Sequence, residues 1–135
     1  MQQELDIKSL NGEPKTNALK IKSDLERDPL NVLFVYTNID GFHLDNYHFG
    51  LATLVSITKN LGHNCKVELL GKKEHYANYE KTINEFQPDI VGFSSVSSQY
   101  VFAKDLAKLA KDVLPNVITI AGGVHPTLSP DSLLE

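Results

Sequence analysis

The sequence predicts an α/β domain built as a doubly wound parallel sheet. From Asn31 onward, short apolar runs alternate with amphipathic stretches, which is the pattern of repeated strand–helix–strand units. The run 32–36 is almost continuously apolar, as in a central strand covered on both faces. With 135 residues, 41% of them hydrophobic and 22% charged, the chain has the size and composition of one globular domain.

The first expected strand, 32–36, is followed by a long polar loop over 37–47. Apolar residues then recur at helical spacing through 51–61, and Gly62 supplies the stop of this helix. The second strand, 65–69, alternates apolar with charged side chains, which is typical of an edge strand with one wetter face. Its two sides are Cys65, Val67 and Leu69 on one and Lys66 and Glu68 on the other.

The second half of the chain repeats this order. The expected elements are a helix over 76–86, a strand over 90–94, a helix over 103–113 and a strand over 117–121. Pro88 and Pro115 end the two helices. Ser129 has the character of an N-cap, followed by Pro130 and the acidic Asp131, so a further helix is expected to begin there.

Right-handed crossovers between four parallel strands give a flavodoxin-like or Rossmann-like sheet with the second strand at one edge. The fifth strand of such a sheet is not found in the sequence, so we expect a truncated chain cut from a longer protein. Residues 1–28 are rich in charge and lack a sustained period, and we expect an arm or linker there, with the α/β domain over 29–135. The strand at 117–121 would then be an apolar edge through which copies of the chain self-associate.

Composition excludes several classes of protein. A formal net charge of −4 disfavours nucleic acid as a partner. No stretch suits a membrane helix and the first residues lack the apolar run of a signal peptide, so we expect a cytoplasmic protein without a membrane partner. Cys65 is the single cysteine, which excludes an intrachain disulfide and any all-cysteine zinc or iron–sulfur site in this chain.

Ligands of open α/β sheets bind at the carboxyl ends of the strands, where three predicted loops meet. The first loop is long and polar. The second carries four hydroxyls and an amide near a helix N-terminus, which suits a neutral polar or anionic group, and the third has paired glycines that permit close approach of a ligand. The candidate cofactor-binding residues are Thr37, Asn38, Ser94, Ser95, Val96, Ser97, Ser98, Gln99, Gly122, Gly123, His125, Pro126 and Thr127.

Simpler interpretations of these residues stay open. Ser97 and Ser98 could be helix caps only, and the paired glycines could form an ordinary turn. His43 and His48 are five residues apart with no third ligand at a zinc spacing, so we expect no metal ligands. No glycine-rich nucleotide motif is present, and no nucleophile is paired with an acid or base, so the sequence does not support catalysis by this chain alone.

Several segments together resemble one known family. They are the strand 32–36, Phe49-Gly50-Leu51-Ala52, Leu61-Gly62-His63, Pro88-Asp89-Ile90-Val91-Gly92 and Gly122-Gly123-Val124-His125-Pro126-Thr127. In this order they resemble the N-terminal cobalamin-binding domain of cobalamin-dependent radical SAM enzymes. The resemblance covers residues 31–135, which is most of the chain.

The resemblance implies that the second and third loops hold cobalamin, with its nucleotide tail in a groove at the strand ends. The chain would then be the cobalamin-binding module of a methyltransferase or related enzyme. S-adenosylmethionine and a [4Fe–4S] cluster would belong to the radical SAM barrel of the parent chain, which is the expected protein partner. The first loop lacks the Asp-x-His spacing of methionine-synthase-like domains, so no histidine ligand below the cobalt is implied. The alternative function is a structural or interaction domain that keeps this fold and has lost cobalamin binding.

Overall fold

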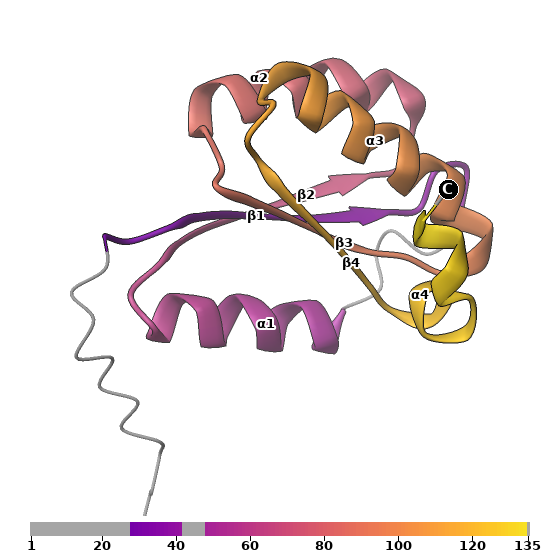
Figure 1. The fold of residues 1–135 in the computed structure, drawn as a ribbon, viewed down its shortest axis with the longest axis horizontal. Helices are drawn as coiled ribbons and strands as arrows, with labels where there is room; N and C mark the ends of the chain where they lie inside the picture. Colours follow the sequence, from indigo (N-terminus) through magenta and orange to yellow (C-terminus); the bar gives the residue numbers. More distant parts are fainter. Residues whose placement is uncertain (1–27, 42–47, 135) are drawn as a thin grey trace, which may run out of the picture.

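The structure, a computed structural model, describes residues 28–41 and 48–134 (Figure 1). It confirms the predicted flavodoxin-like, doubly wound fold, because its four parallel strands lie in the order β2-β1-β3-β4. The strands are β1 (Asn31–Thr37), β2 (Asn64–Leu70), β3 (Ile90–Ser94) and β4 (Ile118–Gly122). The helices are α1 (Phe49–Asn60), α2 (Tyr76–Phe86), α3 (Tyr100–Val113) and α4 (Val124–Leu128), with short 3-10 helices η2 (Lys73–His75), η3 (Ser97–Gln99) and η4 (Pro130–Leu134). The predicted arm at 1–28 falls, except for Asp28, outside the described residues.

The hydrophobic core lies between the sheet and helices α2 and α3, which cover the same face (Figure 1). The strand and helix residues buried in this layer include Leu33, Val35, Val91, Phe93, Ile83, Leu106 and Ala110. Tyr79 of α2 is also fully buried, and its hydroxyl donates a hydrogen bond of 3.2 Å to the backbone oxygen of Leu106 in α3. This phenol oxygen is therefore satisfied within the core, whereas the buried phenol oxygen of Tyr76, also in α2, has no hydrogen-bond partner among the described residues.

The opposite face of the sheet is less completely covered, because α1 packs there against β2 and β1 (Figure 1). Ile118 and Ile120 of β4, which point to this side, are 56% and 52% exposed. On β2, Val67 and Leu69 of the same side are 40% and 52% exposed. The edge position predicted for this strand is confirmed. The single wetter face expected from its alternation is not found, because Lys66 on the other side of the strand is exposed as well.

Glu68 lies on the same side of β2 as Lys66 but is less exposed. It is half-buried and accepts a hydrogen bond of 2.6 Å from the hydroxyl of Thr82 in α2. Leu70, on the same side, is buried in the core. The helix on that face thus covers Glu68 and leaves Lys66 exposed, and α1 leaves the apolar side partly open.

The last part of the chain differs from the prediction in three ways. β4 begins at Ile118 and ends at Gly122, one residue later than expected, with Val117 buried before it. A short helix, α4, occupies Val124–Leu128, where a loop was predicted. Its Pro126 is accommodated because the first N–H groups of a helix have no partner within it. Ser129 does not begin an α-helix: a 3-10 helix, η4, follows at Pro130–Leu134.

The β3–α3 connection is also shorter than predicted, since η3 leads directly into α3 at Tyr100. Within the part of the chain that the structure describes, no helix has both the length and the apolar character needed to cross a bilayer.

Candidate functional site

Three strand ends place one residue each in a row across the sheet. Tyr36 of β1 pairs with Ser94 of β3, and Ser94 pairs with Gly122 of β4. Paired residues of neighbouring strands point to the same side, and successive residues alternate, so this row lies on the side opposite the core. The ring of His48, the residue before α1, packs on Tyr36 with the ring centroids 3.7 Å apart. The row therefore extends from the start of α1 to the exposed edge of the sheet.

The two neighbouring glycines of the third loop have different surroundings. A Cβ built on Gly123 would lie 2.8 Å from the backbone oxygen of Ser95, and its φ of 100° is a conformation that side chains rarely adopt. A Cβ on Gly122 would meet only the backbone oxygen of Phe93, at 3.9 Å. The chain's own backbone requires Gly123, whereas the missing side chain of Gly122 leaves free space beside Ser94.

The second and third loops are hydrogen-bonded into one unit. The backbone N–H of Ser95 donates to the oxygen of Gly122 at 3.0 Å, and the N–H of His125 donates to the oxygen of Ser95 at 3.2 Å. The hydroxyl of Thr127 donates to the oxygen of Gly123 at 2.8 Å. Movement of one loop would therefore break contacts to the other.

Gln99 joins the first loop to this unit. Its side chain is buried, its Oε1 accepts a hydrogen bond of 2.8 Å from the N–H of Ile39, and its Nε2 donates one of 3.2 Å to the oxygen of the same residue. Asn38 is buried beside it, with its backbone N–H donating to the oxygen of Leu70 at 2.8 Å. Both ends of the Gln99 amide are used within the chain, so in this arrangement it positions the first loop.

Thr37 and Ser95 carry buried hydroxyls that have no hydrogen-bond partner among the described residues. They directly follow the paired residues Tyr36 and Ser94, so they lie on neighbouring strand ends and point to the core side of the sheet. An unpaired buried hydroxyl is unfavourable, so these two groups reduce the stability of the strand ends.

His125 contacts three segments of the chain. Its Nδ1 lies 3.1 Å from the hydroxyl oxygen of Ser97, and its Nε2 lies 2.9 Å from that of Ser132. Its ring stacks on Tyr100 with centroids 4.0 Å apart, and the hydroxyl of Tyr100 donates to the backbone oxygen of Ser132 at 2.6 Å. Both ring nitrogens of His125 are thus occupied by hydroxyls.

Val96, Ser97 and Ser98 are exposed at the rim formed by the second loop. The interpretation of the two serines as helix caps is wrong, because neither η3 nor α3 has a side-chain hydrogen bond at its N-cap. Pro126 is half-buried in α4 on the third loop. The serine hydroxyls are therefore available at the surface, although Ser97 also contacts His125.

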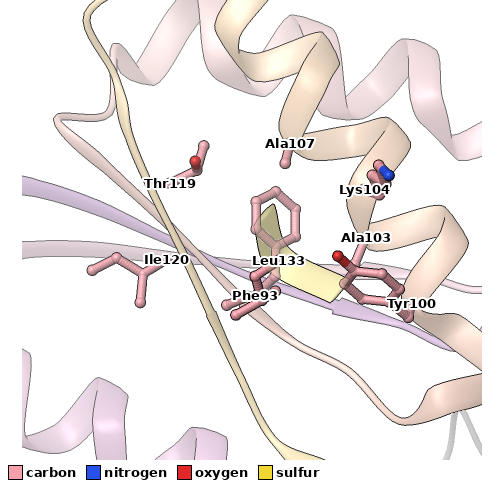
Figure 2. A pocket seen from close by; sticks show the side chains of 9 residues that line it. Phe93, Tyr100, Ala103, Lys104, Ala107, Thr119, Ile120 and Leu133 are labelled. Carbon is pink, nitrogen blue, oxygen red and sulfur yellow. The ribbon is translucent and has the colours of Figure 1, made fainter. Parts of the chain in front are cut away.

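A cavity of about 230 Å³ lies on the core side of the sheet, between α3 and β4 (Figure 2). It is lined by Phe93, Tyr100, Ala103, Lys104, Ala107, Thr119, Ile120, Ala121 and Leu133. Tyr100 therefore borders this cavity and also contacts His125. The cavity is separate from the space beside Gly122, which does not line it.

The described residues include no group of three His, Cys, Asp or Glu side chains that could hold a metal ion. His43 falls outside them, and His48 packs on Tyr36 instead of joining a cluster. Burial raises the pKa of the Tyr36 phenol, so it stays a neutral hydrogen-bonding group near the row.

Sequence reasoning did not single out Tyr36, Tyr100 or Ser132 as parts of this region. Tyr36 could have been found as the last apolar residue of the first strand, at the switch point of the sheet. Tyr100 and Ser132 approach His125 from positions 25 and 7 residues away, and no motif spacing indicates such contacts.

The geometry defines an α/β domain in which three loops meet at the carboxyl ends of the parallel strands. A family model described as the B12 binding domain matches residues 37–135, and the chain belongs to this family. The match confirms the resemblance to cobalamin-binding domains drawn from the sequence.

Curated relatives agree with this assignment. The chain is 35% identical over 83 residues to an uncharacterized methyltransferase of Pyrococcus horikoshii, covering 61% of this chain and 18% of the relative. It is 33% identical over 63 residues to the anaerobic magnesium-protoporphyrin IX monomethyl ester cyclase of Cereibacter sphaeroides, covering 44% of this chain and 10% of the relative. It is 41% identical over 56 residues to the cytidylyl-2-hydroxyethylphosphonate methyltransferase of Streptomyces wedmorensis, covering 41% of this chain and 10% of the relative. The matched segments thus span less than a fifth of each relative's length.

Proposed function

We propose that this chain is the cobalamin-binding module of a radical SAM enzyme, a methyltransferase or a related enzyme, and that it holds the nucleotide tail of the cofactor at the carboxyl ends of its strands. The space beside Gly122 carries this proposal. Its glycine is not required by the packing of the chain, and it lies in a row with Ser94 and Tyr36 at the switch point.

The residues at the strand ends fit such a group. Cobalamin has a ring of carboxamide side chains and a tail with a phosphodiester, which need hydrogen-bond donors and acceptors. The hydroxyls of Ser94 and Ser98 can donate and accept, the hydroxyl of Ser97 can accept, and the free flank of Gly122 supplies room for the tail. When bound, the cofactor supplies a cobalt centre for methyl transfer, while the chain's residues bind and orient it.

In the parent enzyme, S-adenosylmethionine and a [4Fe–4S] cluster would be held by a separate radical SAM barrel, because Cys65 alone cannot supply the ligands of a cluster. Two of the curated relatives carry the word methyltransferase in their names, which supports methyl transfer as the reaction of the parent.

The test is a titration with hydroxocobalamin, followed by absorbance and calorimetry, of the wild-type chain and two valine variants. Gly122→Val should weaken binding about 10-fold or more, because the branched side chain fills the space beside Ser94. Ala121→Val is the matched control, since Ala121 borders the cavity on the opposite side of the sheet. Circular dichroism checks that both variants keep their helices.

Equal affinity of all three proteins would remove the third loop from the site. Absence of binding by the wild-type chain would refute the proposal. It would favour the alternative, an interaction domain of the same fold, for which the exposed Ile118 and Ile120 provide an apolar surface.

A further inference from the structure

His125 lies where the second loop, α3 and the C-terminal turn meet. Both of its ring nitrogens are within hydrogen-bond distance of a serine hydroxyl, Ser97 at Nδ1 and Ser132 at Nε2. Its ring face is covered by the ring of Tyr100. The imidazole is therefore fixed in orientation by three contacts, none of which is an acid or a metal ligand.

The hydrogen bonds of Ser132 define which nitrogen of the neutral ring carries the proton. The hydroxyl of Ser132 donates its single hydrogen to the backbone oxygen of Ser129 at 2.7 Å. It must then accept a hydrogen bond from His125, so the hydrogen of the neutral ring is on Nε2. Nδ1 has a lone pair only, and Ser97 must donate its hydroxyl hydrogen to it.

This arrangement determines what Ser97 can offer to a ligand. Its only hydrogen is directed at His125, so the exposed side of its oxygen presents lone pairs and no donor. A hydroxyl held in this way accepts a hydrogen bond from an amide N–H and is repelled by a phosphate oxygen. Ser98, next to it, has no such constraint in the hydrogen bonds of the described chain.

We propose that His125 is a positioning residue that fixes Ser97 as a hydrogen-bond acceptor for a carboxamide N–H at the edge of the corrin ring. This inference rests on the proposed function, and it adds a division of roles within the second loop. Ser97 selects the amide groups of the cofactor, and the phosphate of the tail is bound by other residues. His125 itself contacts neither the cobalt nor the cofactor.

Two variants of His125 separate its two hydrogen bonds. His125→Asn places an amide oxygen near the position of Nδ1, so this variant can still accept the hydrogen bond from Ser97. His125→Gln places its amide nitrogen near the position of Nε2, so this variant can still donate a hydrogen bond to Ser132. We expect His125→Gln to weaken binding of hydroxocobalamin about 5- to 10-fold, the effect of one hydrogen bond, and His125→Asn to bind like the wild type. Ser97→Ala should weaken the binding of hydroxocobalamin by the same factor. The double variant with His125→Gln should bind no more weakly than either single variant.

Cobinamide, which keeps the amide side chains and lacks the nucleotide tail, identifies the group that Ser97 contacts. The loss caused by His125→Gln should be the same for cobinamide and for hydroxocobalamin. A loss seen with hydroxocobalamin alone would assign Ser97 to the tail and overturn the proposal. Equal weakening by the Asn and Gln variants would also overturn it, because the role of His125 would then be structural only.

Nitrogen-15 NMR of the histidine ring, in the ligand-free wild-type chain, tests the tautomer directly. The expected spectrum has a protonated Nε2 and an unprotonated Nδ1 for His125 at a pH where the ring is neutral, and the opposite assignment would refute the inference. If the wild type binds neither ligand, the proposed function fails along with the ligand role of Ser97. If the wild type binds and the variants do not differ, only the inference fails.

Discussion

Gly122 and Gly123 show how neighbouring residues of one motif serve different needs. At Gly123 the backbone conformation and the closeness of Ser95 exclude a side chain. At Gly122 the surroundings would admit one. The motif thus combines a glycine that the fold requires with a glycine whose surroundings have room for a side chain.

Alanine substitution separates these two needs. Gly123→Ala should lower the free energy of unfolding by about 2 kcal/mol or more, because it forces a side chain into a backbone region that is nearly exclusive to glycine. Gly122→Ala should change that free energy by less than about 0.5 kcal/mol, since its Cβ meets only ordinary contacts. Urea denaturation of the two variants measures both effects. Similar losses in the two would contradict the assignment of Gly123 as the structural glycine.

His48 packs on Tyr36, one of the three residues in the row of strand ends. We expect no protein nitrogen on the cobalt of bound cobalamin, because Asn46 stands where an acid would orient the ring of His48, and Gly41 where one would orient His43. Electron paramagnetic resonance of the cobalt(II) form should show no hyperfine splitting from an axial nitrogen. A splitting that disappears in His48→Ala and persists in His43→Ala would make His48 the ligand.

At the scale of the elements, the contact between α2 and α3 contains a titratable group. Burial raises the pKa of Tyr79 well above its ordinary value of 10.0, and the nearby charge of Glu68 raises it further. The folded state therefore favours the protonated phenol. Its contribution to stability is complete below pH 10 and is lost as the pH rises above that value.

Chemical denaturation between pH 8 and about 11 tests this contribution, with 10 as the ordinary pKa of a phenol. The wild-type chain should lose stability above pH 10 more steeply than Tyr79→Phe, which has no phenol proton to release. At neutral pH, Tyr79→Phe should be less stable than wild type by about 1 kcal/mol, because the hydrogen bond to Leu106 is lost. Parallel pH profiles for the two proteins would show that Tyr79 does not cause the change.

Gln99 connects the first and second loops, and this connection can be measured on the backbone of Ile39. Gln99→Ala leaves both backbone groups of Ile39 without their partner and should cost about 2 kcal/mol of stability. Hydrogen exchange of the Ile39 amide should become faster in this variant and stay unchanged in Ser98→Ala, the neighbouring control. Unchanged protection in Gln99→Ala would mean that the first loop is held by other contacts.

The sequence predicted the elements whose pattern is local. β1 and β3 were found because continuous apolar runs indicate buried parallel strands, and α3 because its apolar residues keep helical spacing. α4 was missed because it has only five residues and contains Pro126. The partial burial of Glu68 in β2 was not predicted, because it depends on Thr82 of α2, which approaches from 14 residues away.

The sequence predicted that three loops meet at the carboxyl ends of the strands, but it did not predict the contacts between them. The rule that ligands bind at the carboxyl ends of parallel strands was sufficient to select the three loops. The partners of His125 and Gln99 are up to 60 residues apart in the chain, and only the folded arrangement brings them together. Which residues hold the loops together is therefore a property of the tertiary structure.

At the scale of the whole molecule, the two faces of the sheet are covered unequally. Helices α2 and α3 bury one face, whereas α1 leaves Ile118 and Ile120 of β4 more than half exposed on the other (Figure 1). β4 is also an edge strand of the sheet, so one side of its backbone has no neighbouring strand in the described chain. An apolar edge strand of this kind is a template for pairing with another chain.

We therefore expect the isolated chain to self-associate through β4 as its concentration increases. Light scattering should show a mass that rises with concentration for the wild type, and Ile120→Lys should keep the chain monomeric, because a charge on an edge strand opposes pairing. Val101→Lys, which replaces an apolar residue of similar exposure on α3, is the matched control and should associate like the wild type. A wild-type chain that stays monomeric at high concentration would contradict the expectation, and equal effects of both lysines would assign the association to general surface charge instead of β4.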